Sequence, residues 1–142
     1  MKQKVFMSWK WVDDQIAILA DLLRDQPIKY VSGIPRGGLI PAIMLSHKLG
    51  AEYLPFDKLQ IAYKIARNQE KNNEVLLVDD ISDTGVTMNG YSETFLTATL
   101  CVRYDSQTMP DVFGEKIHDD RWLVFPWEQN NSKPIQDYLE NK

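Results

Sequence analysis

Apolar residues near the start of the chain recur at spacings of three and four, which is the period of an amphipathic helix. The stripe consists of Val12, Ile16, Leu19, Ala20 and Leu23. Ser8 precedes it as a candidate N-cap, and Pro27 follows it as a helix breaker. The pattern therefore predicts a helix over about residues 9–24.

Beyond this helix, short apolar runs alternate with helical patterns. We predict strands over residues 30–34, 52–54, 59–63, 75–78 and 97–102, and helices over residues 39–49 and 88–95. Gly50 supplies a C-terminal stop for the helix over 39–49. Residues 64–74 are charged and amide-rich, and we interpret them as a loop. Alternating strands and helices predict an α/β fold with a mostly parallel, twisted sheet flanked by helices.

The most informative segment is Val75–Thr87, where an apolar run leads into two adjacent acids and a small turn rich in hydroxyl groups. A continuous apolar run is typical of a buried parallel strand, and open α/β sheets bind ligands beyond the carboxyl ends of such strands. Asp79 and Asp80 stand at that edge. Gly85 lets the backbone approach an anion, and the flanking threonines add donors at the expected first turn of a helix. The turn therefore favours phosphate.

The acids beside this turn need a separate role. Three Asp within five residues repel an anionic ligand by about 1 kcal/mol per charge pair at 4 Å in water. A carboxylate pair accepts well from the vicinal hydroxyls of a ribose, and a divalent cation can bridge carboxylate and phosphate oxygens. Together these features indicate a phosphorylated ribose. The alternatives are a strand end whose Asp and Thr merely cap a helix, and a receiver domain.

Val75–Thr87 resembles the phosphoribosyl-diphosphate (PRPP) signature of type I phosphoribosyltransferases, and the resemblance extends from about Val5 to Glu128. It implies the single-domain fold of that family with a small C-terminal hood. It also implies that Asp83 is the general base and that Asp80 contacts Mg²⁺ directly. The implied contacts with the ribose and 5′-phosphate of PRPP are Asp79, Asp80, Asp83, Thr84, Gly85, Val86 and Thr87.

A second glycine-rich segment lies between the predicted strand over 30–34 and the helix over 39–49. It contains Pro35, Arg36, Gly37 and Gly38. Its glycines free the backbone, Arg36 brings a permanent charge, and the following helix start adds N–H donors, so an anion site and a plain turn with an exposed Arg both fit. The segment resembles the pyrophosphate loop of the purine phosphoribosyltransferases. That resemblance implies a non-proline cis peptide at Pro35–Arg36 or Arg36–Gly37.

Residues 119–128 supply the aromatic surfaces that a purine needs for stacking. The segment resembles its counterpart in 6-oxopurine phosphoribosyltransferases, which implies Trp122 as the stacking ring, the Leu123 carbonyl as a base contact and Glu128 as a second metal ligand. Arg103 takes the place of a Lys that donates to the C6 oxygen of the purine. The alternatives are that the aromatic residues fill the core and that Arg103 is a strand-end cation or ion-pair partner.

The expected function is Mg²⁺-dependent transfer of the phosphoribosyl group from PRPP to guanine, xanthine or hypoxanthine, giving the nucleoside 5′-monophosphate and pyrophosphate. One alternative is a non-catalytic regulatory protein that binds PRPP or a nucleotide. Another is a phosphoribosyltransferase for a different nucleobase, which the replacement of Lys by Arg103 leaves open.

Composition narrows the class further. The 142 residues suit one domain, which we divide into a core over about 5–105, a base-binding hood over about 106–130 and a tail over 131–142. A net charge of −4 with interspersed signs argues against nucleic acid as a partner. No apolar window approaches the ~18 residues of a membrane span, so we expect a soluble, cytoplasmic protein. The family resemblance implies a homo-oligomer, either a dimer or a tetramer.

Overall fold

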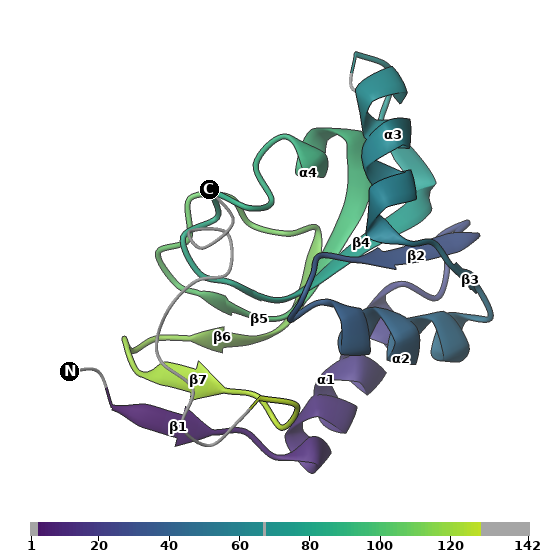
Figure 1. Cartoon of the computed structure of the whole chain (residues 1–142). Coiled ribbons are helices and arrows are strands. Elements are labelled where there is room, and N and C mark those ends of the chain that lie inside the picture. Colours follow the sequence, from purple (N-terminus) through teal and green to yellow (C-terminus); the bar gives the residue numbers. More distant parts are fainter. Residues whose placement is uncertain (1–2, 67, 129–142) are drawn as a thin grey trace.

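The computed structural model describes residues 3–66 and 68–128 and is built around a five-stranded sheet (Figure 1). Every neighbouring pair in this sheet is parallel, in the order β3-β2-β4-β5-β6. Its strands are β2 (Tyr30–Gly33), β3 (Glu52–Tyr53), β4 (Asn72–Ser82), β5 (Phe95–Arg103) and β6 (Val112–Ile117). The helices are α1 (Trp9–Leu22), α2 (Leu39–Leu49), α3 (Phe56–Ala66) and α4 (Tyr91–Thr94). The predicted α/β class is confirmed.

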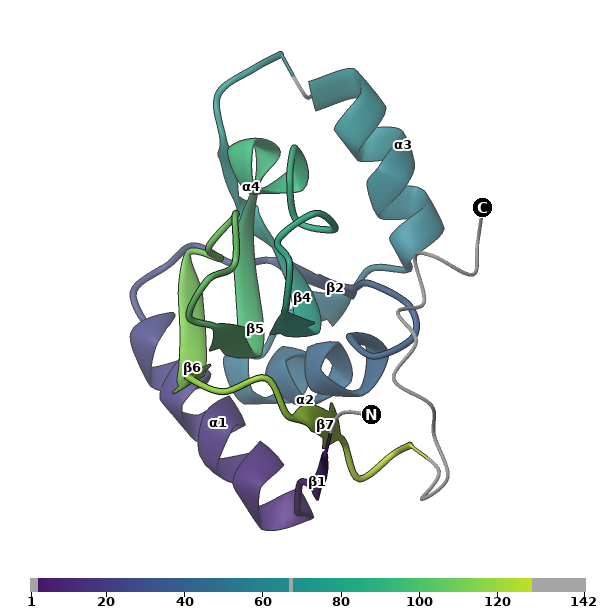
Figure 2. The ribbon, with the colours of Figure 1, turned by 90° about the vertical axis from the view of Figure 1, so that its left-hand side faces the viewer.

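The helices cover both faces of the sheet, with α1 and α2 on one face and α3 and α4 on the other (Figures 1 and 2). Alternate residues of β4 point into two separate cores. Leu76 and Val78 pack in the cluster that includes α1 and α2, while Val75 and Leu77 pack with Leu59 of α3. This arrangement explains why the apolar run in β4 is continuous, since a central strand of a parallel sheet is buried on both faces.

A second, two-stranded parallel sheet joins β1 (Lys4–Phe6) to β7 (Trp122–Val124). In this sheet Val5 is paired with Leu123. It lies on the β6 side of the main sheet (Figure 1). Leu123 is buried in the same cluster as α1 and α2, so the small sheet is attached to the main core through its apolar side chains.

The first predicted helix is confirmed as α1. Its N-cap is Ser8, whose Oγ accepts a 3.0 Å hydrogen bond from the Trp11 N–H. The second predicted helix is confirmed with the same bounds as α2, and it ends at Gly50 in the left-handed conformation.

The strand predicted over residues 59–63 is wrong, because these residues form part of α3. Leu59, Ala62 and Tyr63 recur at helical spacing. Leu59 lies in the core cluster that contains Val75 and Leu77, and Ala62 and Tyr63 pack against that cluster. Asp57 adds an acid in the first turn, where it suits the helix dipole. A run this short carries too little periodicity to separate strand from helix by sequence alone.

The predicted loop over 64–74 and the predicted helix over 88–95 are both too long. The loop loses its start to α3 and its end to β4, which begins at Asn72. The predicted helix shrinks to α4 because residues 86–90 form turns and Phe95 already starts β5. In addition, β4 does not stop before the two acids but continues through them to Ser82.

The segment interpreted as a hood contains two strands that belong to different sheets. β6 pairs with β5 and forms an edge of the main sheet, whereas β7 pairs with β1. The tail predicted over residues 131–142 lies outside the described residues. Within the described part of the chain, no helix is long and apolar enough to cross a membrane.

Candidate active site

The position of the site follows from the unequal lengths of two neighbouring strands, β2 and β4. β2 ends at Gly33, whose partner on β4 is Val78, whereas β4 continues for four more residues beside β5. The chain therefore leaves the sheet next to Asp79 and Asp80. The Ile34 N–H still donates to the Val78 carbonyl at 2.9 Å, which holds the start of the glycine-rich loop against β4.

At two positions of the loop over residues 35–38, the backbone lies so close to β4 that a side chain does not fit. A Cβ added at Gly38 lies 2.3 Å from the Val78 carbonyl oxygen, and a Cβ added at Gly37 lies 2.1 Å from Oδ2 of Asp80. The predicted non-proline cis peptide is confirmed at Pro35–Arg36. Arg36 is exposed, and α2 begins directly after the loop, so the positive end of that helix lies beside it.

The two acids at the end of β4 are half-buried and take part in local hydrogen bonds. Oδ1 of Asp79 accepts from the Asp80 N–H at 2.8 Å, and Oδ1 of Asp80 accepts from the Ile81 N–H at 2.8 Å. Beneath them the thiol of Cys101 is buried and points to the Asp80 carbonyl at 3.9 Å. The structure therefore brings Asp80 and the glycine loop to one edge of the sheet.

The turn over residues 83–87 follows β4 directly and packs against the loop between β5 and β6. Gly85 has φ +89°, and a Cβ added there lies 2.3 Å from the Thr108 backbone nitrogen. The Gln107 N–H donates to the Thr84 carbonyl at 2.8 Å, and Ser82 Oγ donates to the Thr108 carbonyl at 2.9 Å. The turn is held in place from below, while Thr84 and Val86 are exposed at its outer side. It does not open directly into a helix, because further turns precede α4.

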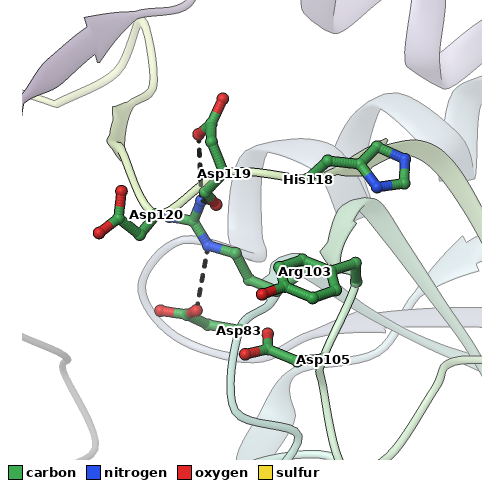
Figure 3. Close-up of a pocket in the computed structure, with 7 residues that line it drawn as sticks. Asp83, Arg103, Asp105, His118, Asp119 and Asp120 are labelled. Atoms are coloured by element: carbon green, nitrogen blue, oxygen red, sulfur yellow. Dashed lines mark hydrogen bonds and ion pairs between the residues drawn. The ribbon is translucent and has the colours of Figure 1, made fainter.

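A polar cleft of about 330 Å³ opens beside this turn (Figure 3). It is lined by Asp83, Arg103, Tyr104, Asp105, His118, Asp119 and Asp120. Two of these residues, Asp83 and Arg103, were predicted as site residues. The other five were missed, although the available signal was the cluster of charged and aromatic residues at the ends of β5 and β6.

Arg103 joins three parts of the cleft. Its Nε donates to Oδ1 of Asp83 at 3.1 Å, its Nη1 donates to the Asp119 carbonyl at 2.8 Å, and its Nη2 donates to the carbonyl of Arg121. The side chain of Asp119 in turn is paired with the side chain of Arg121. That hydrogen bond is the main cause that lowers the pKa of Asp119.

The remaining predicted base and metal residues do not line the cleft. Trp122 is half-buried in β7, and its indole nitrogen is buried without a hydrogen-bond partner among the described residues. Leu123 is buried in the core. Oε1 of Glu128 accepts from the Phe125 N–H at 2.9 Å, which closes a turn after β7. Phe125 stacks on Trp127 and also contacts Trp11, so these aromatic rings fill the core, as the alternative interpretation allowed.

The carboxylate of Asp80 fits a divalent cation that is shared with a ligand. Mg²⁺ is usually held by one or two carboxylates and by substrate phosphates, and the missing side chain at Gly37 leaves the Asp80 oxygens close to the Arg-Gly-Gly loop. Among residues 3–66 and 68–128, no three His, Cys, Asp or Glu side chains cluster in a way that could hold a metal without such a ligand.

A parallel sheet with an acid pair, a Thr-Gly-Val-Thr turn and an Arg-Gly-Gly loop at one edge resembles the arrangement of the type I phosphoribosyltransferases. Comparisons with known proteins confirm this resemblance and its purine branch. A xanthine-guanine phosphoribosyltransferase of Nitratidesulfovibrio vulgaris is 27% identical over 140 residues, which cover 89% of this chain and 86% of the relative. The enzyme of the same name from Chromohalobacter salexigens is 24% identical over 99% of this chain and 94% of its own length.

Among solved structures, a purine phosphoribosyltransferase from Pyrococcus horikoshii superimposes with a TM-score of 0.69 at 27% identity, covering 92% of this chain and 97% of that one. No family profile matches the chain. The chain is thus similar in sequence and in fold to purine phosphoribosyltransferases.

The buried thiol beneath the acid pair gives a prediction about stability and pH. Burial, and secondarily the Asp80 carboxylate, raises the pKa of Cys101 well above its ordinary value. The thiol of the unfolded chain releases its proton above about pH 8.5, whereas the folded chain keeps it, so this group lowers stability as the pH rises. In urea unfolding, the free energy of unfolding of the wild type should fall by about 1 kcal/mol more than that of Cys101→Ala between about pH 7.5 and 9.5. Parallel pH profiles for the two proteins would contradict the raised pKa.

Proposed function

We propose that the protein transfers the phosphoribosyl group from PRPP to a 6-oxopurine, giving the nucleoside 5′-monophosphate and pyrophosphate. The single observation that carries this proposal is the approach of the Arg-Gly-Gly loop to the acid pair, with Gly37 directly against the carboxylate of Asp80. Two anion-binding segments flank a pair of hydroxyl acceptors there, and PRPP carries a phosphate, a diol and a pyrophosphate in the same order. The xanthine-guanine and purine specificities of the relatives support a purine acceptor.

In this proposal, PRPP lies along the carboxyl edge of the sheet. Its ribose hydroxyls donate hydrogen bonds to the carboxylates of Asp79 and Asp80. Its 5′-phosphate binds the backbone and hydroxyl donors of residues 83–87, where the positive φ of Gly85 shapes the turn. Its pyrophosphate binds residues 35–38, where Arg36 and the start of α2 supply positive charge.

The purine binds on the other side of C1, near the cleft beside Asp83 and the start of β7. We assign its stacking surface to Trp122 and a backbone contact to the Leu123 carbonyl. A ring nitrogen of the base forms a bond to C1 while the bond from C1 to the pyrophosphate oxygen breaks with its electron pair. Asp83 accepts the proton that the base loses, and Arg36 stabilises the charge on the departing pyrophosphate.

Mg²⁺ fits this scheme at Asp80, with Glu128 assigned to a second ion on the pyrophosphate. When bound, the ion would neutralise negative charge on the phosphate oxygens. We further propose a cytoplasmic homo-oligomer, a dimer or tetramer, as the working form. The family resemblance supports the use of Mg²⁺ and the assembly into an oligomer.

The acceptor is tested by measuring pyrophosphate release from PRPP and Mg²⁺ with each base offered separately. We expect turnover with guanine, xanthine or hypoxanthine and none with adenine, uracil or orotate. Turnover confined to adenine or to a pyrimidine would contradict the purine assignment. No pyrophosphate release with any base, together with PRPP binding in calorimetry, would point instead to a regulatory protein.

The role of Asp83 is tested by Asp83→Asn. Because the amide cannot accept the proton, kcat should fall by about 10²- to 10⁴-fold, while the Kd for PRPP with Mg²⁺ stays within about threefold of the wild type. Asp14→Asn is the control, since Asp14 is an exposed residue of α1 and should keep full activity. Unchanged turnover in Asp83→Asn would remove this residue as the base.

The close contact of the glycine loop with Asp80 is tested by Gly37→Ala. The new Cβ displaces the Asp80 carboxylate or the loop itself, so calorimetry should show PRPP and Mg²⁺ binding weakened by at least about tenfold. Gly50→Ala is the control, because Gly50 has a φ of +64° and its substitution should lower stability but not PRPP binding. Equal affinity in Gly37→Ala and the wild type would mean that the pyrophosphate does not bind here.

A further inference from the structure

Arg103 is the one charged residue that is buried among the described residues, with an exposed fraction of 5%. Removing a guanidinium from water is costly unless charge and hydrogen bonds compensate it. The compensation comes from the Asp83 carboxylate and from the two backbone carbonyls of Asp119 and Arg121. A solvated strand-end cation would have no need of this arrangement.

These three contacts connect segments that are distant in the sequence. Arg103 ends β5, Asp83 opens the turn after β4, and residues 119–121 lead directly into Trp122 of β7. Figure 3 shows the guanidinium lying between Asp83 on one side and Asp119 on the other. A single side chain therefore connects the turn after β4 with the segment that leads into Trp122.

We propose that Arg103 is a positioning residue, which fixes the Asp83 carboxylate and the backbone before Trp122 and thereby acts on the base through them rather than by contact with its C6 oxygen. The proposal rests on the function proposed above. It differs from the role that the family resemblance implies for this position, where a Lys donates to the base itself.

The shape of the guanidinium supports this role. Its planar fork presents Nε and both Nη groups in fixed directions, and here each direction has its own acceptor. A Lys carries one compact ammonium at the end of a flexible stem, so it cannot reach the Asp83 oxygen and both carbonyls in the same fixed geometry. Arg103→Lys therefore separates the two roles. A base-contacting residue tolerates the change, whereas a residue that bridges three segments does not.

The first experiment measures steady-state kinetics of Arg103→Lys with the 6-oxopurine that the wild type prefers. We expect kcat/KM for the base to fall by on the order of 10- to 100-fold, through both kcat and KM, with the KM for PRPP within about threefold of the wild type. Arg121→Gln is the control, because it removes a cation from the same segment but leaves the Arg121 carbonyl in place. A Lys variant as active as the wild type would overturn the proposal.

A double-mutant cycle tests whether Arg103 acts through Asp83. In an Asp83→Asn background the carboxylate partner is already gone, so Arg103→Lys should reduce kcat much less than it does in the wild type. The loss of kcat in the double variant should fall short of the product of the two single losses by most of the factor that Arg103→Lys costs on its own. Losses that multiply fully would show that the two residues act independently, and this result would overturn the proposal.

A third measurement does not depend on turnover. In amide hydrogen exchange, Arg103→Lys should increase exchange in the peptide that spans residues 118–123, while Arg121→Gln should not. Unchanged protection in Arg103→Lys would overturn the bridge. A wild type that is inactive on every base but loses this protection in Arg103→Lys would instead overturn the proposed transferase function and leave the bridge in place.

Discussion

The site depends on the contact between backbone and strand end at the junction of β2 and β4. Because β2 stops opposite Val78, the chain must turn where β4 still continues, and the turning residues that approach β4, Gly37 and Gly38, have no room for a side chain. A methyl group at Gly38 would collide with the Val78 carbonyl, and one at Gly37 would collide with Asp80. Two glycines thus bring a loop suited to anions within contact distance of a carboxylate. Without a bridging group, that carboxylate would repel an anionic ligand bound to the loop.

The same edge is fixed independently from the opposite side. The loop between β5 and β6 lies under the turn after β4. The Ser82 hydroxyl donates to the Thr108 carbonyl, and the Gln107 N–H donates to the Thr84 carbonyl. The positive φ of Gly85 lets these two backbones approach each other. The turn is therefore held by hydrogen bonds below, and its outer side remains available for a ligand. Rigid support on one side and an open face on the other is what a binding loop requires.

Local sequence signals predicted the parts of the fold that local physics determines. α2 has the predicted bounds because an apolar stripe, a preceding glycine loop and Gly50 all act within a few residues of it. The strand at 59–63 was wrong because one apolar segment of five residues suits either period, and only packing against Tyr91 and Phe95 from later in the chain selects the helix. β1 and β7 were missed for the same reason. Each has three residues, and each exists only because the other lies beside it.

The same distinction between local and long-range signals separates the predicted parts of the candidate site from the parts that were not predicted. The glycine loop and the acid pair were recognised from the sequence because each is a contiguous motif with its own chemistry. The cleft was not recognised, since its lining comes from the turn after β4 and from the ends of β5 and β6, and no contiguous stretch contains it.

Arg103 illustrates the difference. Its residue type shows a permanent charge at the end of an apolar strand, but a buried charge is defined by its partners, and these come from residues 83, 119 and 121. Burial without those partners would destabilise the fold, so the partners and the Arg are a single feature. Two of the three partners are backbone carbonyls, which every residue has, and for this reason a sequence pattern can indicate the cation but not the segments that it joins.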